Sequence, residues 1–301
     1  MTRMLTRDTA AFLDFTRTCA DDFGPATAKA AFLVAPDGFG LATESASDNR
    51  YMAKASAFDA ARASAQHRDL QRALSAELPV ICFAGNPATP DAVFPNNVFA
   101  TAPGRLIVGR MRHPVRQREA MRADIRQFFT GSLGYEETDL SSQPHVCELT
   151  GALVIDRATG LGYCGLSERC DEAGARLMHE AFGLRATLMF DLAAGEYHTN
   201  VVLTILGSRG VIIAPGGFAD LRVTNAIIEF YAPHAVMLSS QEKNAFAANA
   251  ITLTEDAVWM SQIAADGLSA ANREILKRAG FDLHAVNLSE IEKAGGSLRC
   301  C

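Results

Sequence analysis

Short polar signatures recur along this 301-residue chain about 50 residues apart, a spacing typical of repeated supersecondary units. Each of the first four precedes a strand-like apolar run. They are FPNN at 94–97, CELTG at 147–151, YHTN at 197–200 and FAAN at 246–249. A fifth, GGSLRC, occupies 295–300. Polar side chains placed at one point of each repeat can converge on a shared axis. The repeat thus predicts a thiol-based centre built from an acid, a histidine and a cysteine.

The repeating unit is read most clearly in its fourth copy. Apolar runs at 201–206 and 211–214 flank a glycine-containing turn, and a helical stretch to 231 and a strand at 235–238 follow. We count five such strand–strand–helix–strand units, including predicted helices at 57–78 and 116–129. Because neither end resembles a polar cap, a closed α/β propeller with five blades fits better than an open solenoid.

The domain organisation follows from the first unit. Residues 1–29 precede the first unit, and we expect them to form a helical extension. Its helix is predicted over about 8–19, and Gly24-Pro25 should interrupt any further helix. Residues 30–301 hold all five units and are expected to form a single catalytic domain. A closed repeat can exceed 200 residues as one domain.

Composition limits the partners and the compartment. The net charge is −6 with no long basic run, which argues against nucleic acid. No apolar stretch approaches the roughly 20 residues of a membrane span. The seven cysteines show no C-x-x-C spacing, so we expect no metal and reduced thiols in the cytoplasm.

The order of these signatures resembles the guanidine-modifying (pentein) superfamily of arginine deiminases, amidinotransferases and dimethylarginine hydrolases. Within it, residues 30–301 look most like the citrulline utilisation hydrolases, whose patterns read approximately PDAVFPNNWFS, LEGTGSLVLDR, YHTNV and GGSxRC. The matching segments here are PDAVFPNNVFA at 90–100 and ELTGALVIDR at 148–157. The resemblance implies a five-bladed pseudosymmetric α/β propeller and a cofactor-free hydrolase of carbon–nitrogen bonds in arginine metabolism.

Three residues are expected to carry the chemistry. The resemblance assigns Cys300 as the nucleophile, with Cys301 as the competing neighbour, and a thiol on a polar turn can be partly exposed and activated. His198 can accept the thiol proton and later donate it to a leaving amine. Glu148 would orient His198 or hold a substrate N–H.

Substrate recognition is predicted at five further positions. Arg169 resembles the arginine that grips the substrate carboxylate, through two parallel hydrogen bonds. Asn97 and Asn200 stand where guanidinium-processing relatives commonly hold aspartates. Since asparagine offers both a donor and an acceptor, these two favour a neutral ureido group. Asn96 and Asp91 complete the predicted site. Loop or capping roles explain Asp91 and Asn49 equally well, and capping of turns is a reasonable explanation for Asn249 and Asn96.

The leading hypothesis is hydrolysis of a ureido amino acid, most simply citrulline, to ornithine, ammonia and carbon dioxide through a covalent Cys300 intermediate. The enzymatic alternative is an arginine deiminase or dihydrolase. An amidinotransferase is less favoured, because nothing signals a second amine site. The non-enzymatic alternative is a pentein used as a binding scaffold. The expected partner is a small ureido or guanidino amino acid, and a homodimer is compatible with the resemblance.

Overall fold

The computed structural model describes residues 3–52 and 58–301 and contains five separate β-sheets among them. Four sheets comprise β1-β9-β8-β7, β4-β5-β6, β10-β11-β12 and β13-β14-β15, and the fifth pairs β2 with β3. The strands are β1 Met4–Thr6, β2 Ala31–Val34, β3 Val80–Phe83, β4 Phe99–Ala102, β5 Arg105–Val108, β6 Glu136–Asp139, β7 Leu153–Asp156, β8 Leu161–Leu166, β9 Ala186–Asp191, β10 Leu203–Leu206, β11 Gly210–Ile213, β12 Ala235–Met237, β13 Ile251–Thr252, β14 Ala257–Ser261 and β15 Asp282–Val286.

The same pairing pattern repeats in four of the sheets. An antiparallel hairpin, such as β10–β11, is followed by a strand that pairs in parallel, such as β12. A parallel neighbour needs a crossover connection, and helices supply it between the second and third strands. The α-helices are α1 Thr9–Thr16, α2 Thr43–Ala46, α3 Ala60–Ser75, α4 Pro114–Gln117, α5 Ala123–Gln127, α6 Leu149–Ala152, α7 Glu172–Phe182, α8 Leu221–Phe230, α9 Ser240–Asn244, α10 Gln262–Gly267 and α11 Ala270–Arg278.

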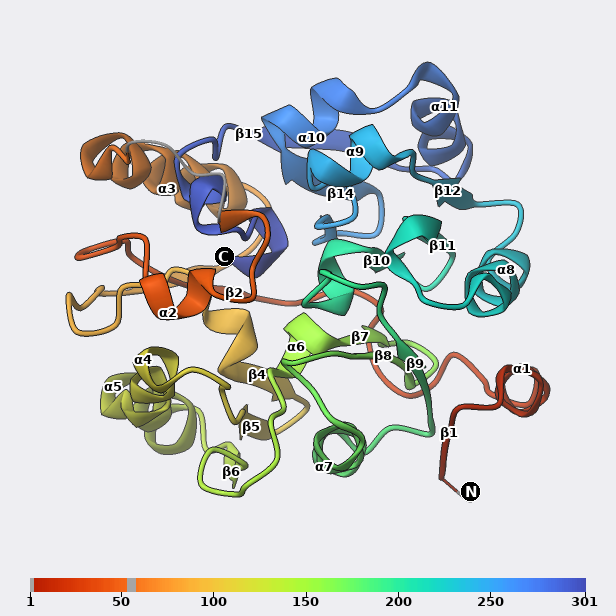
Figure 1. Cartoon of the computed structure of the whole chain (residues 1–301), viewed down its shortest axis with the longest axis horizontal. Helices are drawn as coiled ribbons and strands as arrows, with labels where there is room; N and C mark the ends of the chain where they lie inside the picture. Colours follow the sequence, from red (N-terminus) through yellow and green to blue (C-terminus); the bar gives the residue numbers. More distant parts are fainter. Residues whose placement is uncertain (1–2, 53–57) are drawn as a thin grey trace.

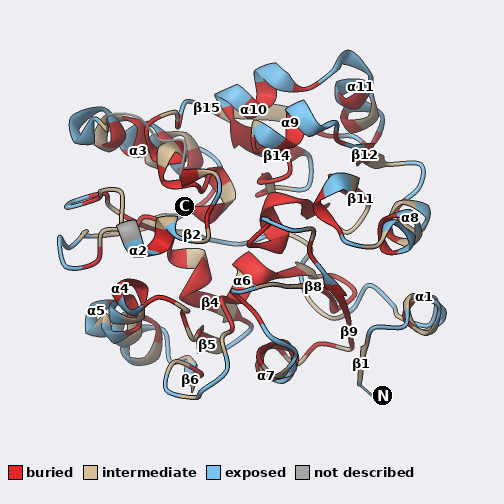
Figure 2. Ribbon diagram, in the orientation of Figure 1, coloured by how far each residue is buried: buried red, intermediate tan, exposed pale blue. Residues whose placement is uncertain are grey.

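The longer helices have clear end signals in the sequence. The Asp171 side chain accepts a hydrogen bond from the Gly174 N–H at the start of α7. At its other end Gly183 takes the left-handed conformation, with φ of 68°, that favours glycine. In Figure 1, α3, α7, α8 and α11 lie at the outside, whereas the C-terminus lies near the middle. Buried residues gather toward the middle and exposed ones on the outer helix faces (Figure 2).

Most predicted elements of the repeat are confirmed, but the helix predicted over 116–129 is wrong as a single helix. That segment is divided into α4, the 3-10 turn η3 (Arg118–Met121), α5 and the π turn η4 (Phe128–Ser132). The division occurs because Arg122 has an extended backbone, with ψ of 92°. The helix predicted from 57 begins as α3 at Ala60, and residue 57 lies outside the described residues.

The N-terminal segment joins a sheet that the sequence did not assign to it. The predicted helix is present as α1, and β1 pairs in parallel with β9, with Met4 opposite Ala186 and Thr6 opposite Leu188. Phe12 of α1 is buried and packs edge-on against Tyr163 of β8. The extension is therefore packed onto the third repeat unit.

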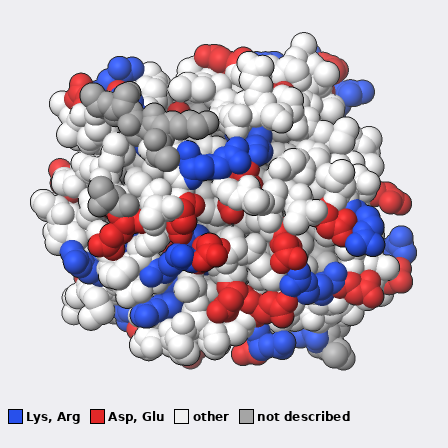
Figure 3. Space-filling view, in the orientation of Figure 1, with Lys and Arg blue, Asp and Glu red and all other residues white. Residues whose placement is uncertain are grey.

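Three further observations concern the surface charges, the helices and possible metal ligands. Basic and acidic side chains lie interspersed over the face seen in Figure 3. Within 3–52 and 58–301, no helix has the length and apolar character needed to cross a bilayer. Over the same residues, no three His, Cys, Asp or Glu side chains are grouped as a metal site would require.

Candidate active site

Short helical turns at the inner ends of the repeat units carry the polar signatures. They are η2 (Pro95–Asn97), α6 (Leu149–Ala152), η5 (Thr199–Val201) and η8 (Leu298–Cys300). The turn η2 contacts both α6 and η8, and α6 contacts η5. Signatures about 50 or more residues apart therefore meet in one place, as the repeat predicted.

A pocket with an empty volume of about 340 Å³ opens where these turns meet. Five of the predicted residues line it: Asp91, Asn97, Arg169, His198 and Cys300. Its other lining residues include Ser45, Asn49, Met52, Phe94, Arg116, Tyr197 and the backbone at 294–296. The lining thus combines charged and polar groups with the apolar side chains of Met52 and Phe94, a mixture typical of small-molecule sites.

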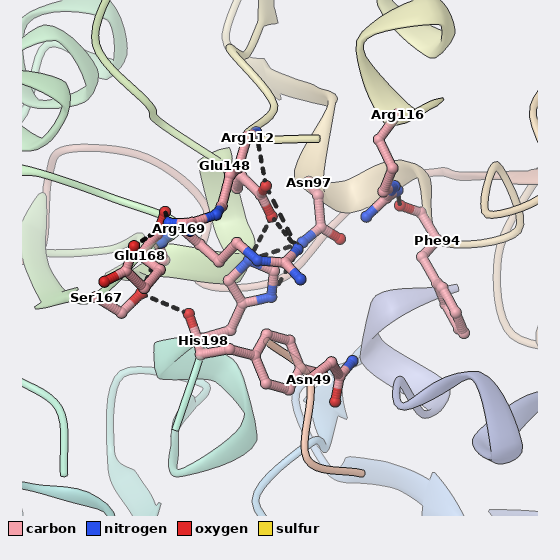
Figure 4. Close-up of polar contacts among 12 residues, drawn as sticks. Asn49, Phe94, Asn97, Arg112, Arg116, Glu148, Ser167, Glu168, Arg169 and His198 are labelled. Atoms are coloured by element: carbon pink, nitrogen blue, oxygen red, sulfur yellow. Dashed lines mark hydrogen bonds and ion pairs between the residues drawn. The ribbon is translucent and has the colours of Figure 1, made fainter. Parts of the chain in front are cut away.

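Glu148 and His198 form the central polar pair of the site (Figure 4). The Nε2 atom of His198 lies 2.8 Å from Oε2 of Glu148, and both side chains are buried. Burial alone would raise the pKa of Glu148, but the charge of Arg169 and the hydrogen bond from His198 outweigh it and hold that pKa far below its usual value. Glu148 is therefore a carboxylate, and it accepts the Nε2–H.

The ring of His198 is also fixed from its other side. Burial lowers the pKa of His198, while the contact with Glu148 opposes this shift, so the neutral ring is favoured at neutral pH. The Asn97 amide nitrogen lies 3.1 Å from Nδ1 and 3.2 Å from Nε2, so it contacts the ring edge between them. Gly151 passes directly behind the ring, where a Cβ atom would lie 2.8 Å from Cε1 of His198. A larger residue at 151 would displace the imidazole.

Cys300 lines the pocket and is buried, so it does not lie on an exposed turn. The expectation of a partly exposed thiol is wrong, because Cys300 is only 2% exposed and belongs to a buried apolar cluster. Burial raises the pKa of the Cys300 thiol, against hydrogen bonds that favour the thiolate. Its neighbour Cys301 is buried in the same cluster, and the pocket lining includes Cys300 but not Cys301.

Arg169 is held by two carboxylates. Its Nη1 lies 3.2 Å from Oε2 of Glu148, and its Nε donates to Oδ2 of Asp48 over 3.0 Å. Asp48 was not predicted, and its loop has no pattern that marks it. The Arg169 guanidinium also lies over the ring of Tyr197, 5.6 Å from its centroid. Arg169 therefore both lines the pocket and keeps Glu148 ionised.

Asp91 and Arg116 also line the pocket. Ser45 Oγ donates to Oδ2 of Asp91 over 2.5 Å, whereas Oδ1 of Asp91 is buried without a partner among the described residues. Burial raises the pKa of Asp91, and the charge of Arg116 opposes the rise. Arg116 itself pairs with Glu119 and donates to the Phe94 carbonyl over 2.9 Å. The sequence analysis did not predict Arg116 as a site residue and placed it only at the start of a helix.

The remaining predicted asparagines lie behind the pocket wall. Asn96 donates from Nδ2 to the Cys300 carbonyl over 2.7 Å and accepts at Oδ1 from Asn200 over 3.2 Å. The amide nitrogen of Asn200 is 3.7 Å from Sγ of Cys300. Only Asn97 of these three lines the pocket, whereas Asn96 and Asn200 contact Cys300 from outside it.

A buried thiol, a carboxylate–histidine pair and a buried arginine facing one polar pocket form a site of the guanidine-modifying hydrolase type. Known proteins agree with this class. The family described as N,N dimethylarginine dimethylhydrolase, eukaryotic, matches residues 35–301, and the chain belongs to that family. It is a hydrolase acting on carbon–nitrogen bonds other than peptide bonds.

Individual relatives are distant. An uncharacterised protein of Caenorhabditis elegans is 26% identical over 251 residues, which cover 80% of this chain and 83% of the relative. The dimethylarginine dimethylaminohydrolase of Mycobacterium tuberculosis is 28% identical over 212 residues, or 70% of this chain and 65% of the relative.

Solved structures share the α/β pentein fold. The substrate-bound N-terminal domain of a cyanobacterial arginine dihydrolase superposes with a TM-score of 0.76 at 20% identity, over 89% of this chain and 95% of that domain. A dimethylarginine dimethylaminohydrolase bound to S-methyl-L-thiocitrulline gives a TM-score of 0.69 at 19% identity, over 91% of this chain and 98% of that one.

Proposed function

We propose that this hydrolase converts citrulline to ornithine, ammonia and carbon dioxide through a covalent intermediate on Cys300. The observation that carries the choice of substrate is the neutral amide of Asn97, which lines the pocket beside His198 and Cys300. A ureido group is uncharged and ends in a carbonyl oxygen, to which an amide N–H can donate. A carboxylate at residue 97 would instead face that oxygen with a buried charge.

The chemistry assigns one step to each group. The Cys300 thiolate attacks the ureido carbon, and negative charge develops on the carbonyl oxygen of a tetrahedral intermediate. His198 holds the thiol proton and gives it to the departing amine, while Glu148 stabilises the charged imidazole. Water then cleaves the carbamoyl thioester, which restores the thiol and releases carbamate that decomposes to ammonia and carbon dioxide.

Arginine is a second candidate, favoured by one specific observation. The Oδ1 atom of Asp91 is buried in the pocket without a partner among the residues that the structure describes. Such an oxygen suits a guanidinium, which offers only donors and a positive charge. The family membership supports a guanidino substrate as well. In that case the chain would act as a deiminase or dihydrolase.

The same site supports the proposed residue roles and fold. We assign Arg169 to the substrate carboxylate, Asp91 and Asn97 to the reacting end, and Asn96 and Asn200 to support of Cys300. The catalytic domain proposed for 30–301 would be a five-bladed propeller, with 1–29 as an extension. Hydrogen bonds between neighbouring units support closure: Thr150 to Asn96, Thr199 to Ala152, Asn249 to Asn200 and Asn96 to Cys300.

The test is a comparison of citrulline, arginine and asymmetric dimethylarginine by release of ornithine, citrulline and ammonia. We expect ornithine from citrulline. Citrulline that accumulates from arginine and is not consumed would assign a deiminase instead. In Asp91→Asn, any activity on arginine should fall by a larger factor than activity on citrulline. A covalent adduct on Cys300, trapped by acid quench and detected by mass spectrometry, would exclude a pure binding scaffold.

A further inference from the structure

Asn249 belongs to the fourth polar signature and lies directly against the nucleophile. It is fully buried in the turn that follows α9, and its Nδ2 lies 3.3 Å from Sγ of Cys300. Asn200 is the other amide donor near this sulfur, at 3.7 Å, and it also donates to Oδ1 of Asn96. Asn249 is therefore the nearer of the two donors. The sequence alone is explained equally simply if Asn249 caps a turn.

The orientation of this amide is determined on all sides. Its Oδ1 accepts a hydrogen bond from the Arg299 backbone N–H over 3.1 Å, so the oxygen must point that way. Its Nδ2 donates to the Asn200 carbonyl over 2.9 Å. An amide group has two N–H bonds, and the second is left for the sulfur. Rotating the amide would place its nitrogen against the Arg299 N–H.

We propose that Asn249 is a further catalytic residue, which stabilises the thiolate form of Cys300 by donating a hydrogen bond to its sulfur. The inference rests on the proposed role of Cys300 as nucleophile. A neutral thiol is a weak acceptor, whereas a hydrogen bond to a charged group is about twice as strong as one between neutral groups. The donor therefore favours the ionised sulfur and offsets part of the effect of burial.

The same contact acts twice in a covalent mechanism. The sulfur loses its negative charge when it attacks the substrate carbon and recovers that charge when water displaces it from the thioester. A fixed donor at the sulfur lowers the energy of the thiolate before attack and of the departing thiolate afterwards. Because Asn249 is held by backbone groups at both 200 and 299, it makes the donor available without reorganisation.

The experiment measures the ionisation of Cys300 directly. The rate of alkylation of Cys300 by iodoacetamide is followed against pH by peptide mass spectrometry in a Cys301→Ala background. In Asn249→Ala the apparent pKa of Cys300 should rise by about one unit, which lowers the thiolate fraction near neutral pH about tenfold. The limiting rate at high pH should not fall, because a thiolate of higher pKa is the stronger nucleophile. An unchanged pKa in that variant would overturn the proposal.

Two further variants distinguish stabilisation of the Cys300 thiolate from a purely structural role of Asn249. Asn249→Asp keeps the size of the side chain and the acceptor for the Arg299 N–H, but it replaces the donor with a charge, so its Cys300 pKa should rise further. Asn244→Ala is the matched control, since Asn244 is exposed nearby and bonds to Arg50, and its Cys300 pKa should equal that of the parent.

A measurement on the unsubstituted chain covers the case in which the Asn249 variants do not fold. The side-chain ¹⁵N resonance of Asn249 should shift at the pH where Cys300 ionises, and this shift should vanish in Cys300→Ala. A ¹⁵N chemical shift of Asn249 that does not change as Cys300 ionises would refute the proposal. None of these readouts requires turnover. If the chain produced no ornithine, the proposed function would fail, while the link between Asn249 and the Cys300 pKa would still be measured.

Discussion

Glu148 and His198 are joined by a 2.8 Å hydrogen bond between Oε2 and Nε2 inside a fully buried part of the protein. Since Glu148 is ionised, the Nε2 atom carries the proton and Nδ1 keeps its lone pair. This single contact fixes both the tautomer and the direction of the ring. The nitrogen that can act as a base is then Nδ1.

The first prediction concerns that tautomer. Glu148→Gln can offer an N–H to Nε2, which would place the ring proton on Nδ1 and remove the base. We expect kcat to fall by about 10²–10⁴-fold with little change in the fold. His198→Asn should give a similar loss. Exposed Glu168, which pairs with Arg112 outside the pocket, provides the control Glu168→Gln. Near-normal turnover in Glu148→Gln would contradict the assigned pair.

The two adjacent cysteines should differ in function although both are buried. Cys300→Ala should abolish turnover, because Cys300 alone of the two lines the pocket. It should also cost about 1 kcal/mol of stability, since the side chain lies in the core. Cys301→Ala should retain activity. Ammonia release and urea unfolding would be measured on both variants, and the reverse pattern of activity would show that the nucleophile is Cys301.

The choice between ureido and guanidino substrates can be tested at Asn97. In Asn97→Asp a carboxylate would face the oxygen on which charge develops during attack. One donor at such a position is worth roughly 2.7–4 kcal/mol, so kcat/KM for citrulline should fall about 10²–10³-fold. Relative activity on arginine should rise. Asn200→Asp is the informative comparison, because it places its charge beside Sγ and should slow both substrates. Unchanged citrulline turnover in Asn97→Asp would refute the ureido assignment.

Buried His67, which lies outside the pocket, should make the free energy of unfolding depend on pH. It is buried in α3, its Nε2 has no partner among the described residues, and burial lowers its pKa to about 4. The unfolded chain protonates this ring near its ordinary pKa of 6.5. The free energy of unfolding should therefore decrease as the pH falls from 6.5 toward 4, by up to about 3 kcal/mol from this group.

Replacing that ring should make the acid response shallower. Urea unfolding of His67→Leu and the wild type would be compared at neutral pH and at a pH between the two pKa values. The variant should lose less stability on acidification, and the exposed His145→Gln control should follow the wild type. An identical loss in His67→Leu would mean that other groups account for the whole effect.

The sequence predicted the site residues best where they stand in the repeated polar signatures. Asn97, Glu148, His198 and Cys300 were all predicted from signatures at equivalent points of the units, and their turns meet at one pocket. Asn249 occupies the same kind of position, and that repeat was the signal that could have identified it. Its side chain was explained locally as a cap, because a turn is visible in the sequence whereas a contact with residue 300 is not.

Long-range electrostatics could not be predicted in this way. Asp48 holds Arg169, and Arg116 lines the pocket while paired with Glu119, yet neither residue stands in a signature. Charged residues in loops and on helices are usually solvated, so their burial depends on how the units pack. The exposure of Cys300 was misjudged for the same reason, since a polar Gly-Gly turn appears exposed until neighbouring units cover it.

The pairing of β1 with β9 also bears on self-association. The residues of β9 are almost all buried, and β1 covers the side of that strand not already paired with β8. A chain lacking β1 would present the backbone of β9 as an open edge, and open edges are templates for strands of another molecule. The three residues of β1, Met4–Thr6, thus cover an edge to which a strand of a second molecule would otherwise be able to pair.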